Sequence, residues 1–322
     1  MINDYYQYYR NLLKDKYSKD ELLGRMQKRF GLPPGNITIG TIGRQVNFDC
    51  LLITEEDKLL AIPLKSTKGI LVNKNIKLSL GENLFKTHQW VLPPFVPMGK
   101  VKKLASTPLS NDALLLFKEI YSTEVIVRQL KGTYSRIQEF KSHESLIVES
   151  IECFYSKHVA ASITLMLTII EGISREYCDN NRIKYNKAGA TSAFKAIMKN
   201  QKNVWLNKIL LVDKYILPSD YLEETFLRRI DEGMDLLITY EQYGLEYLYK
   251  SNSNHPLNRH SILHGTNKSF YIDINFYRLF SCLEALAFAI SLNPFYYSVD
   301  MPEEAFKLLV KLNRLENLLN LH

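Results

Sequence analysis

Residues 142–178 read SHESLIVESIECFYSKHVAASITLMLTIIEGISREYC, and this stretch decides the fold class of the chain. Apolar residues recur at helical spacing on both sides of a polar break at 156–158, which predicts a helical hairpin over 143–178. The most apolar part, 159–170, is shorter than the roughly 18–20 residues that cross a bilayer. The stretch therefore indicates two packed helices of a globular domain.

Helical patterns continue from about residue 111 almost to the end of the chain. Further helices are predicted over 112–140 (one long helix or two), 190–216 (one or two short helices), 219–250, 272–291 and 301–320. The helices at 143–178 and 272–291 are apolar on more faces than a lone bundle would bury. This excess predicts an interface shared by two copies of the chain.

The first hundred residues have a different pattern. Residues 4–30 predict two helices, with Ser18 near the cap of the second. Residues 36–100 then contain short β-branched runs between turn residues: NITIGTIG, NFDCLLIT, KLLAIPL, GILV and IKLSL. A proline-rich segment at 91–103 closes this module. We therefore expect a mainly α protein with a small β-rich module: an N-terminal α+β module over 1–105 and a helical domain over 106–322, whose core lies at about 140–292.

Composition narrows the class of protein. Of 322 residues, 46% are hydrophobic and 23% are charged, which excludes a disordered chain, a collagen and a coiled-coil rod. Residues 1–142 hold 22 basic and 13 acidic residues, whereas 143–322 hold 19 and 21. This asymmetry predicts a basic N-terminal part that faces a polyanion, unless its lysines only keep a small domain soluble.

The cysteines and the N-terminal residues indicate in which cellular compartment the protein is found. Four cysteines lie far apart without a CxxC pair, which predicts buried, reduced thiols: Cys50, Cys153, Cys178 and Cys282. Residues 1–17 contain no apolar core of a secretory signal. We expect a cytoplasmic protein with no membrane association.

One short stretch combines residues suited to acid–base chemistry on a phosphate. It reads LNRHSILHG and covers 257–265. On a helix His260 and His264 would be i,i+4 neighbours with Arg259 beside them. Histidine exchanges protons near neutral pH, and a guanidinium offers fixed paired donors to phosphate oxygens. Phosphodiester cleavage without a metal or a cofactor fits this set, and Gly265 predicts a turn before the next helix.

The stretch R-H-S-I-L-H resembles the R-x4-H signature of the HEPN superfamily, in which Asn, His or Asp follows the arginine. The resemblance covers about 140–292 and includes the apolar hairpin. It implies a dimerising bundle of about four helices that cleaves RNA without a metal. Arg259 and His264 would be the catalytic pair, with His260 and Asn258 supporting them in a composite site between two copies.

A polar stripe crosses the apolar helix that the hairpin pattern predicts. It consists of four residues at helical spacing: Thr164, Thr168, Glu171 and Arg175. A carboxylate on a core-facing helix needs a partner. Glu171 either orients Arg259 and lines the cleft, or forms a local pair with Arg175, and the local pair is the simpler interpretation.

The resemblance implies a biological role, and two alternative functions remain. The setting is a toxin or abortive-infection effector of phage defence that acts on RNA, with tRNA and mRNA as candidates, under the control of an inhibitor or trigger protein. One rival is a non-catalytic dimerisation and nucleic-acid- or protein-binding module. Another is a companion of nucleotidyl-transfer chemistry, although the chain lacks the G-S…D-x-D pattern that such an enzyme needs. P-loop, Rossmann, H-E-x-x-H and G-x-S-x-G motifs are absent from the sequence.

Overall fold

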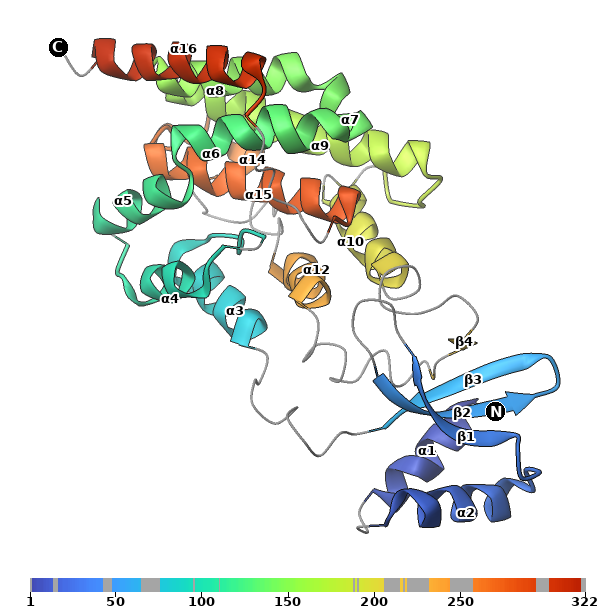
Figure 1. Ribbon diagram of the computed structural model, residues 1–322. Coiled ribbons are helices and arrows are strands. Elements are labelled where there is room, and N and C mark those ends of the chain that lie inside the picture. The colour runs from blue at the N-terminus through green and yellow to red at the C-terminus, as the bar shows by residue number, and fades with distance from the viewer. Residues whose placement is uncertain are drawn as a thin grey trace. The chain divides into compact units, whose positions relative to one another are not determined.

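The computed structural model describes residues 2–13, 17–42, 48–64, 76–94, 96–109, 111–187, 189, 191–205, 215–216, 218, 232–243, 257–293 and 301–319. The chain divides into two compact units (Figure 1). Unit 1 comprises Met1–Ile76 and Asn203–Asp235, and unit 2 comprises Lys77–Lys202 and Leu236–His322. The structure is mainly helical with one small sheet, which confirms the predicted fold class.

Unit 1 is built on the sheet, in the order β1-β2-β3-β4. Its strands are β1 (Ile37–Ile42), β2 (Phe48–Glu55), β3 (Lys58–Pro63) and β4 (Tyr215–Ile216). The first three form an antiparallel meander in the predicted segments, with Leu51 opposite Ile62. The strand β4 runs parallel to β3. It lies in a segment where the sequence pattern predicted helix, so that expectation was wrong for residues 215–216.

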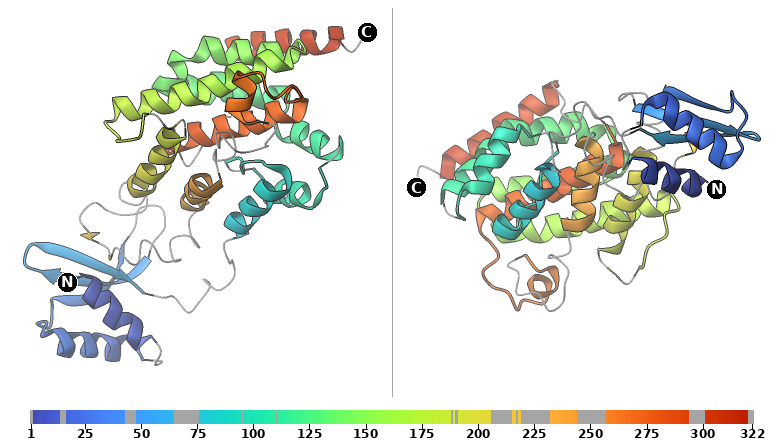
Figure 2. Two further views of the ribbon diagram at one scale, coloured as in Figure 1. Left: turned by 180° about the vertical axis from the view of Figure 1, so that it is seen from behind. Right: turned by 90° about the horizontal axis from the view of Figure 1, so that it is seen from below.

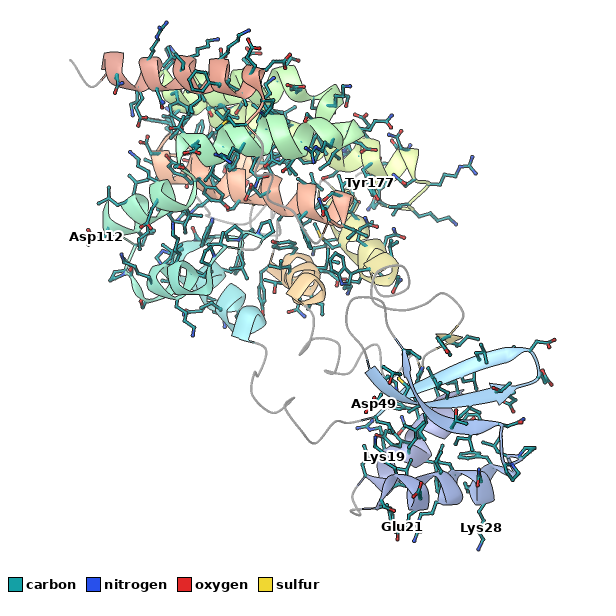
Figure 3. All side chains as sticks on the ribbon, in the orientation of Figure 1. Lys19, Glu21, Lys28, Asp49, Asp112 and Tyr177 are labelled. Atoms are coloured by element: carbon teal, nitrogen blue, oxygen red, sulfur yellow. The ribbon has the colours of Figure 1, made fainter. Side chains whose placement is uncertain are left out.

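Two helices accompany the sheet in unit 1, α1 (Ile2–Leu12) and α2 (Lys19–Phe30). Ser18 caps α2 as expected: its Oγ accepts from Glu21 N at 3.3 Å, and its own N donates to Glu21 Oε2 at 2.8 Å. Lys19 Nζ lies 3.7 Å from Asp49 Oδ2 on β2, and Figure 3 labels both residues. The helix therefore lies against the sheet.

Unit 2 is a helical bundle. Its helices are α3 (Ile76–His88), α4 (Met98–Ser106), α5 (Asn111–Ile120), α6 (Thr123–Arg128), α7 (Gln138–Ser142), α8 (Glu144–Tyr155), α9 (Val159–Asn180), α10 (Ser192–Val204), α12 (Glu232–Tyr243), α14 (Arg259–Leu263), α15 (Asp273–Ser291) and α16 (Glu303–Leu319). The helices α3, α10 and α12 each include a few residues assigned to unit 1. The predicted hairpin is confirmed as α8 and α9, and the last two predicted helices as α15 and α16.

The helix α15 is the centre of unit 2. Every residue from Ile274 to Ile290 is buried, and Phe276 stacks on Phe154 of α8 with ring centroids 3.8 Å apart. Gln201 Nε2 of α10 donates to Ala289 O at 2.7 Å. The helix is long and apolar enough to cross a membrane, but its side chains are enclosed by the unit. This is the placement of a core helix.

Two further expectations about secondary structure were wrong. The run IKLSL lies in α3 rather than in a strand, because Leu84 and His88 continue the pattern at helical spacing and are both fully buried. The segment 112–140 is not one helix or two. It breaks after α5, where Ser122 Oγ accepts from Val125 N at 3.4 Å and caps α6. A π-helical turn (Gln129–Thr133) and a 3-10 turn (Tyr134–Arg136) then lead to α7.

The excess of positive charge lies in the helical unit. Unit 1 carries 16 basic and 15 acidic residues, whereas unit 2 carries 25 and 19. The compact units divide the chain near residue 76, so the charge asymmetry between residues 1–142 and 143–322 does not coincide with their boundary. The predicted GILV strand and residues 219–231 of the predicted helix 219–250 lie outside the described residues. Three of the four cysteines are buried as expected, and Cys153 is partly exposed.

Candidate functional site

The motif forms its own short helix, α14, beside α9. Asn258 is its N-cap: the Oδ1 atom accepts from Ser261 N at 3.0 Å, and the residue is 1% exposed. Gly265 follows with φ +69°, a left-handed conformation that glycine adopts without strain. The predicted turn is confirmed. In Figure 2 (left), α14 is the short orange helix on the face of unit 2 that is turned away in Figure 1.

Glu171 binds two arginines at once. Its Oε1 accepts from Nε and Nη2 of Arg175 at 3.0 and 2.8 Å, one helical turn further along α9. Its Oε2 lies 3.0 Å from Nε of Arg259 on α14. The sequence offered these contacts as alternatives, and the structure contains both. One carboxylate between two guanidiniums leaves a net charge of +1.

These three side chains are partly or largely buried, so their contacts with each other affect stability. The carboxylate of Glu171 is 13% exposed, and the two guanidinium side chains are each about one-third exposed, at 32% and 33%. A charge that is mostly withdrawn from water depends on its partners for stability. Glu171 and Arg259 therefore form an ion pair at the edge of the bundle, although Oε2 and Nε do not meet in hydrogen-bond geometry.

The two histidines lie together beside this ion pair. Their ring centroids are 4.3 Å apart with an angle of 58° between the planes, and His264 N donates to His260 O at 3.0 Å. Both residues are exposed, whereas Ile262 between them is 6% exposed and points inward. The structure thus places His260 and His264 together on an exposed side of the motif, as their i,i+4 spacing predicted, whereas the Arg259 side chain is directed toward Glu171 of α9. Asn258 belongs to the cap beneath them.

A hydrogen-bonded loop, 264–272, connects the motif to α15. Thr266 N and Asn267 N both donate to Ser261 O, at 2.9 and 3.0 Å. At the other end of the loop Asn275 Nδ2 of α15 donates to Phe270 O at 2.8 Å. The loop is therefore fixed at both ends, and it holds α14 in place against the bundle.

The loop also exposes apolar side chains next to the motif. Leu263 at the end of α14 is 44% exposed, and Tyr271 and Ile272 are 57% and 48% exposed. Sequence reasoning missed these residues, although apolar residues inside a polar segment are a usable signal for an interaction surface.

The earlier reason for expecting a dimer does not hold for α15. That helix is apolar on all faces because its own unit encloses it, so its composition does not indicate a second copy. The exposed apolar residues of unit 2 lie elsewhere, and Leu263, Tyr271 and Ile272 are the ones beside the motif.

Another polar cluster of unit 2 has a structural role. Ser142 Oγ lies 3.0 Å from both carboxylate oxygens of Glu176, and His143 Nδ1 lies 3.4 Å from Glu176 Oε2. The other ring nitrogen of His143 packs against the Cα of Gly172, where a Cβ would be 2.9 Å from it. In a serine-hydrolase triad one ring nitrogen of the histidine faces the serine and the other faces the carboxylate, whereas here Glu176 lies on the Nδ1 side and Nε2 faces Gly172. This cluster instead fastens the α7–α8 turn to α9.

Within the part of the chain that the structure describes, three or more potential metal ligands do not come together at any point. The chemistry of the edge therefore rests on Arg259, His260 and His264 with Glu171 behind them. Comparison of the chain with protein-family models, curated proteins and solved structures finds no match.

Proposed function

We propose that unit 2 is a HEPN-like ribonuclease domain that cleaves RNA without a metal ion. The observation that carries the proposal is the Glu171 carboxylate, which pairs with Arg259 on the same short helix segment that exposes two histidines. Arg259 and His264 are the catalytic pair in this account. The positive net charge of the Glu171, Arg175 and Arg259 group favours the approach of a phosphate.

The reaction is an in-line attack of a ribose 2′-hydroxyl on the adjacent phosphorus. A neutral imidazole of His264 takes the hydroxyl proton as the O2′–P bond forms. The P–O5′ bond breaks, and an imidazolium protonates the leaving O5′ atom. The products are a 2′,3′-cyclic phosphate and a 5′-hydroxyl. Arg259 donates to the phosphate oxygens, on which negative charge accumulates in the transition state.

A dimer supplies the two protonation states that this reaction needs. One imidazole must act as base while another acts as acid, and two copies of His264 across a two-fold axis provide both. Leu263, Tyr271 and Ile272 expose apolar surface next to the motif, which supports an interface at this position. Sedimentation at micromolar concentration should therefore find a dimer, and a monomer alone would remove the composite site.

A non-catalytic dimerisation and binding module is the second candidate. The ion pair of Arg259 with Glu171 favours it, because an arginine that is held by a carboxylate can serve packing alone. In either case we place the protein in the cytoplasm. In the catalytic case its activity belongs to a toxin or abortive-infection effector, with tRNA or mRNA as substrate and with an inhibitor or trigger protein that restrains it.

Purified protein incubated with total RNA in EDTA separates the two candidates. The ribonuclease should fragment the RNA in the chelator, because no ion is needed to activate a nucleophile. An Arg259→Ala variant of matched purity should leave the RNA intact. Cleavage that requires Mg²⁺ or Mn²⁺, or that is equal in the two proteins, would refute the assignment.

A further inference from the structure

The segment that follows α9 is the most one-sidedly charged stretch of unit 2. Between residues 180 and 202 there are six basic residues and no acidic ones: Arg182, Lys184, Lys187, Lys195, Lys199 and Lys202. The first three lie in the loop 181–187, and all three are exposed. The other three lie on α10.

The basic residues of α10 occupy one face of the helix. Lys195, Lys199 and Lys202 follow each other at intervals of four and three residues, which is the spacing of a single helical face. The opposite face carries the buried residues of α10, and from it Gln201 Nε2 donates to Tyr177 Oη at 3.1 Å. Figure 3 labels Tyr177 at the end of α9, where α10 approaches it. Packing therefore orients the lysines away from the core.

Part of this charge is not neutralised by carboxylates. Lys202 pairs with Glu241 of α12. Among the residues that the structure describes, Arg182, Lys184 and Lys199 form no ion pair with a carboxylate. Asp179 is the nearest acidic residue in sequence, and the Tyr185 hydroxyl donates to its Oδ1 at 3.2 Å. A partly uncompensated row of cations on a fixed helix and loop attracts a polyanion.

The row is connected to the candidate site through one residue. Arg175 Nη1 donates to Lys187 O at 3.1 Å, while its Nε and Nη2 bind the same Glu171 carboxylate that holds Arg259. Along α9, Glu171 and the helix end at Asn180 are about 14 Å apart at 1.5 Å per residue. The loop that carries Lys187 is thus linked through Arg175 to the carboxylate that pairs with Arg259.

We infer that Arg182, Lys184, Lys187 and Lys199 form the track on which the RNA backbone lies as it leaves the Arg259–His264 site. This inference rests on the proposed function for the identity of the ligand. Cations on flexible stems bind phosphates through charge and do not read bases, so the track binds RNA of any sequence. It adds affinity and orientation, whereas α14 carries the reaction.

A binding titration tests the track separately from cleavage. The full chain with His264→Ala, which keeps the RNA intact, is titrated onto a fluorescent single-stranded RNA at several salt concentrations. In this background Lys184→Gln, Lys187→Gln and Lys199→Gln are combined. The matched control removes the same charge from α4 and α5, through Lys102→Gln, Lys103→Gln and Lys118→Gln. Figure 1 shows those helices and α10 at opposite ends of α15.

The track predicts weaker binding by the first triple variant and a salt slope that is lower by about two, since each lost contact to a single strand removes about 0.7. The loss should be equal for uridine-rich and adenosine-rich RNA, and the control should keep the parent slope. Equal slopes in both triples would overturn the track, even if the wild-type protein cleaves RNA. A selective loss of binding would sustain it, even if the wild-type protein left RNA intact and the cleavage proposal had failed.

Discussion

The helices α14 and α15 are separated by only nine residues, yet they have opposite roles. In α15 every side chain from Ile274 to Ile290 is buried, whereas α14 buries Ile262 and leaves His260 and His264 exposed. The core helix contributes stability through packing, and the short helix presents polar groups on a fixed edge. Substitutions in the two helices should therefore affect different properties, activity in α14 and folding in α15.

The largest expected effect is on activity at α14. His264→Ala and Arg259→Ala should each lower the cleavage rate by about 10²–10⁴-fold, because a proton-transfer group or a phosphate donor is lost. His264→Ala should change the free energy of unfolding by only about 1 kcal/mol, since its side chain is exposed, whereas Arg259→Ala should cost more, since it leaves the mostly buried Glu171 carboxylate with one arginine partner instead of two. Initial rates and urea unfolding measure the two quantities. Lys268→Ala, on the same loop, is the control and should leave both unchanged.

The converse effect is expected in α15. Phe280 is fully buried and contacts the rings of Tyr121, Tyr134 and Phe276. Phe280→Ala should lower the free energy of unfolding by about 3–5 kcal/mol. Activity per folded molecule should stay near the wild-type value. If Phe280→Ala instead inactivates a fully stable protein, the separation of roles between the two helices is wrong.

An intermediate effect is expected at the loop between the two helices. Ile272→Asp places a charge on exposed apolar surface, so the stability of a single copy should change by less than about 0.5 kcal/mol. The dimer dissociation constant should rise about tenfold, and cleavage should fall with it. Leu115→Asp changes a residue that is 63% exposed on α5 and provides the control. Sedimentation that finds the same dimer in both variants would place the interface elsewhere.

The smallest expected effect is a change in folding stability with pH, caused by Glu284 on α15. Burial raises the pKa of Glu284 well above its ordinary value of 4.5. Between that value and the raised pKa the folded state holds one more proton than the unfolded state, so stability falls as the pH rises. Glu284→Gln cannot ionise, and its melting temperature relative to wild type should therefore increase from pH 5 to pH 8. Parallel melting curves across this range would contradict a buried, protonated Glu284.

His88 makes the folding stability depend on pH in the direction opposite to Glu284. Desolvation lowers the pKa of this fully buried imidazole below 6.5, so the unfolded state binds protons first as the pH falls. His88 therefore lowers the free energy of unfolding as the pH falls below 6.5, whereas Glu284 lowers it as the pH rises. Comparing Glu284→Gln with wild type at each pH cancels this shared contribution.

Features that depend on local sequence were predictable. The α8–α9 hairpin, the first three strands and the Ser18 cap follow from hydrophobic spacing and from one hydroxyl beside the first helical turn. The contact between His260 and His264 follows from their i,i+4 spacing in the same way. These features need no knowledge of distant residues.

Features that depend on distant residues were not predictable. The short strand β4 forms only because β3, about 150 residues earlier, offers it an edge. An all-apolar helix has the same composition whether its own unit or a second copy covers it, which is why α15 was misread. The sequence could not show that Glu171 contacts both Arg175 and Arg259, because the second contact depends on how α14 packs against α9. The pair of Arg175 with Glu171 was predictable from their i,i+4 spacing, whereas the contact of Arg175 with Lys187 O was not.

The central claim is that Arg259 and His264 cleave RNA by transfer to the 2′-hydroxyl. Its most direct test is the chemical nature of the ends formed on a labelled RNA in EDTA, for wild type and for folded His264→Ala. The account predicts a 2′,3′-cyclic phosphate and a 5′-hydroxyl from the wild type and intact RNA from the variant. A 5′-phosphate product, or cleavage that survives in folded His264→Ala, would contradict it.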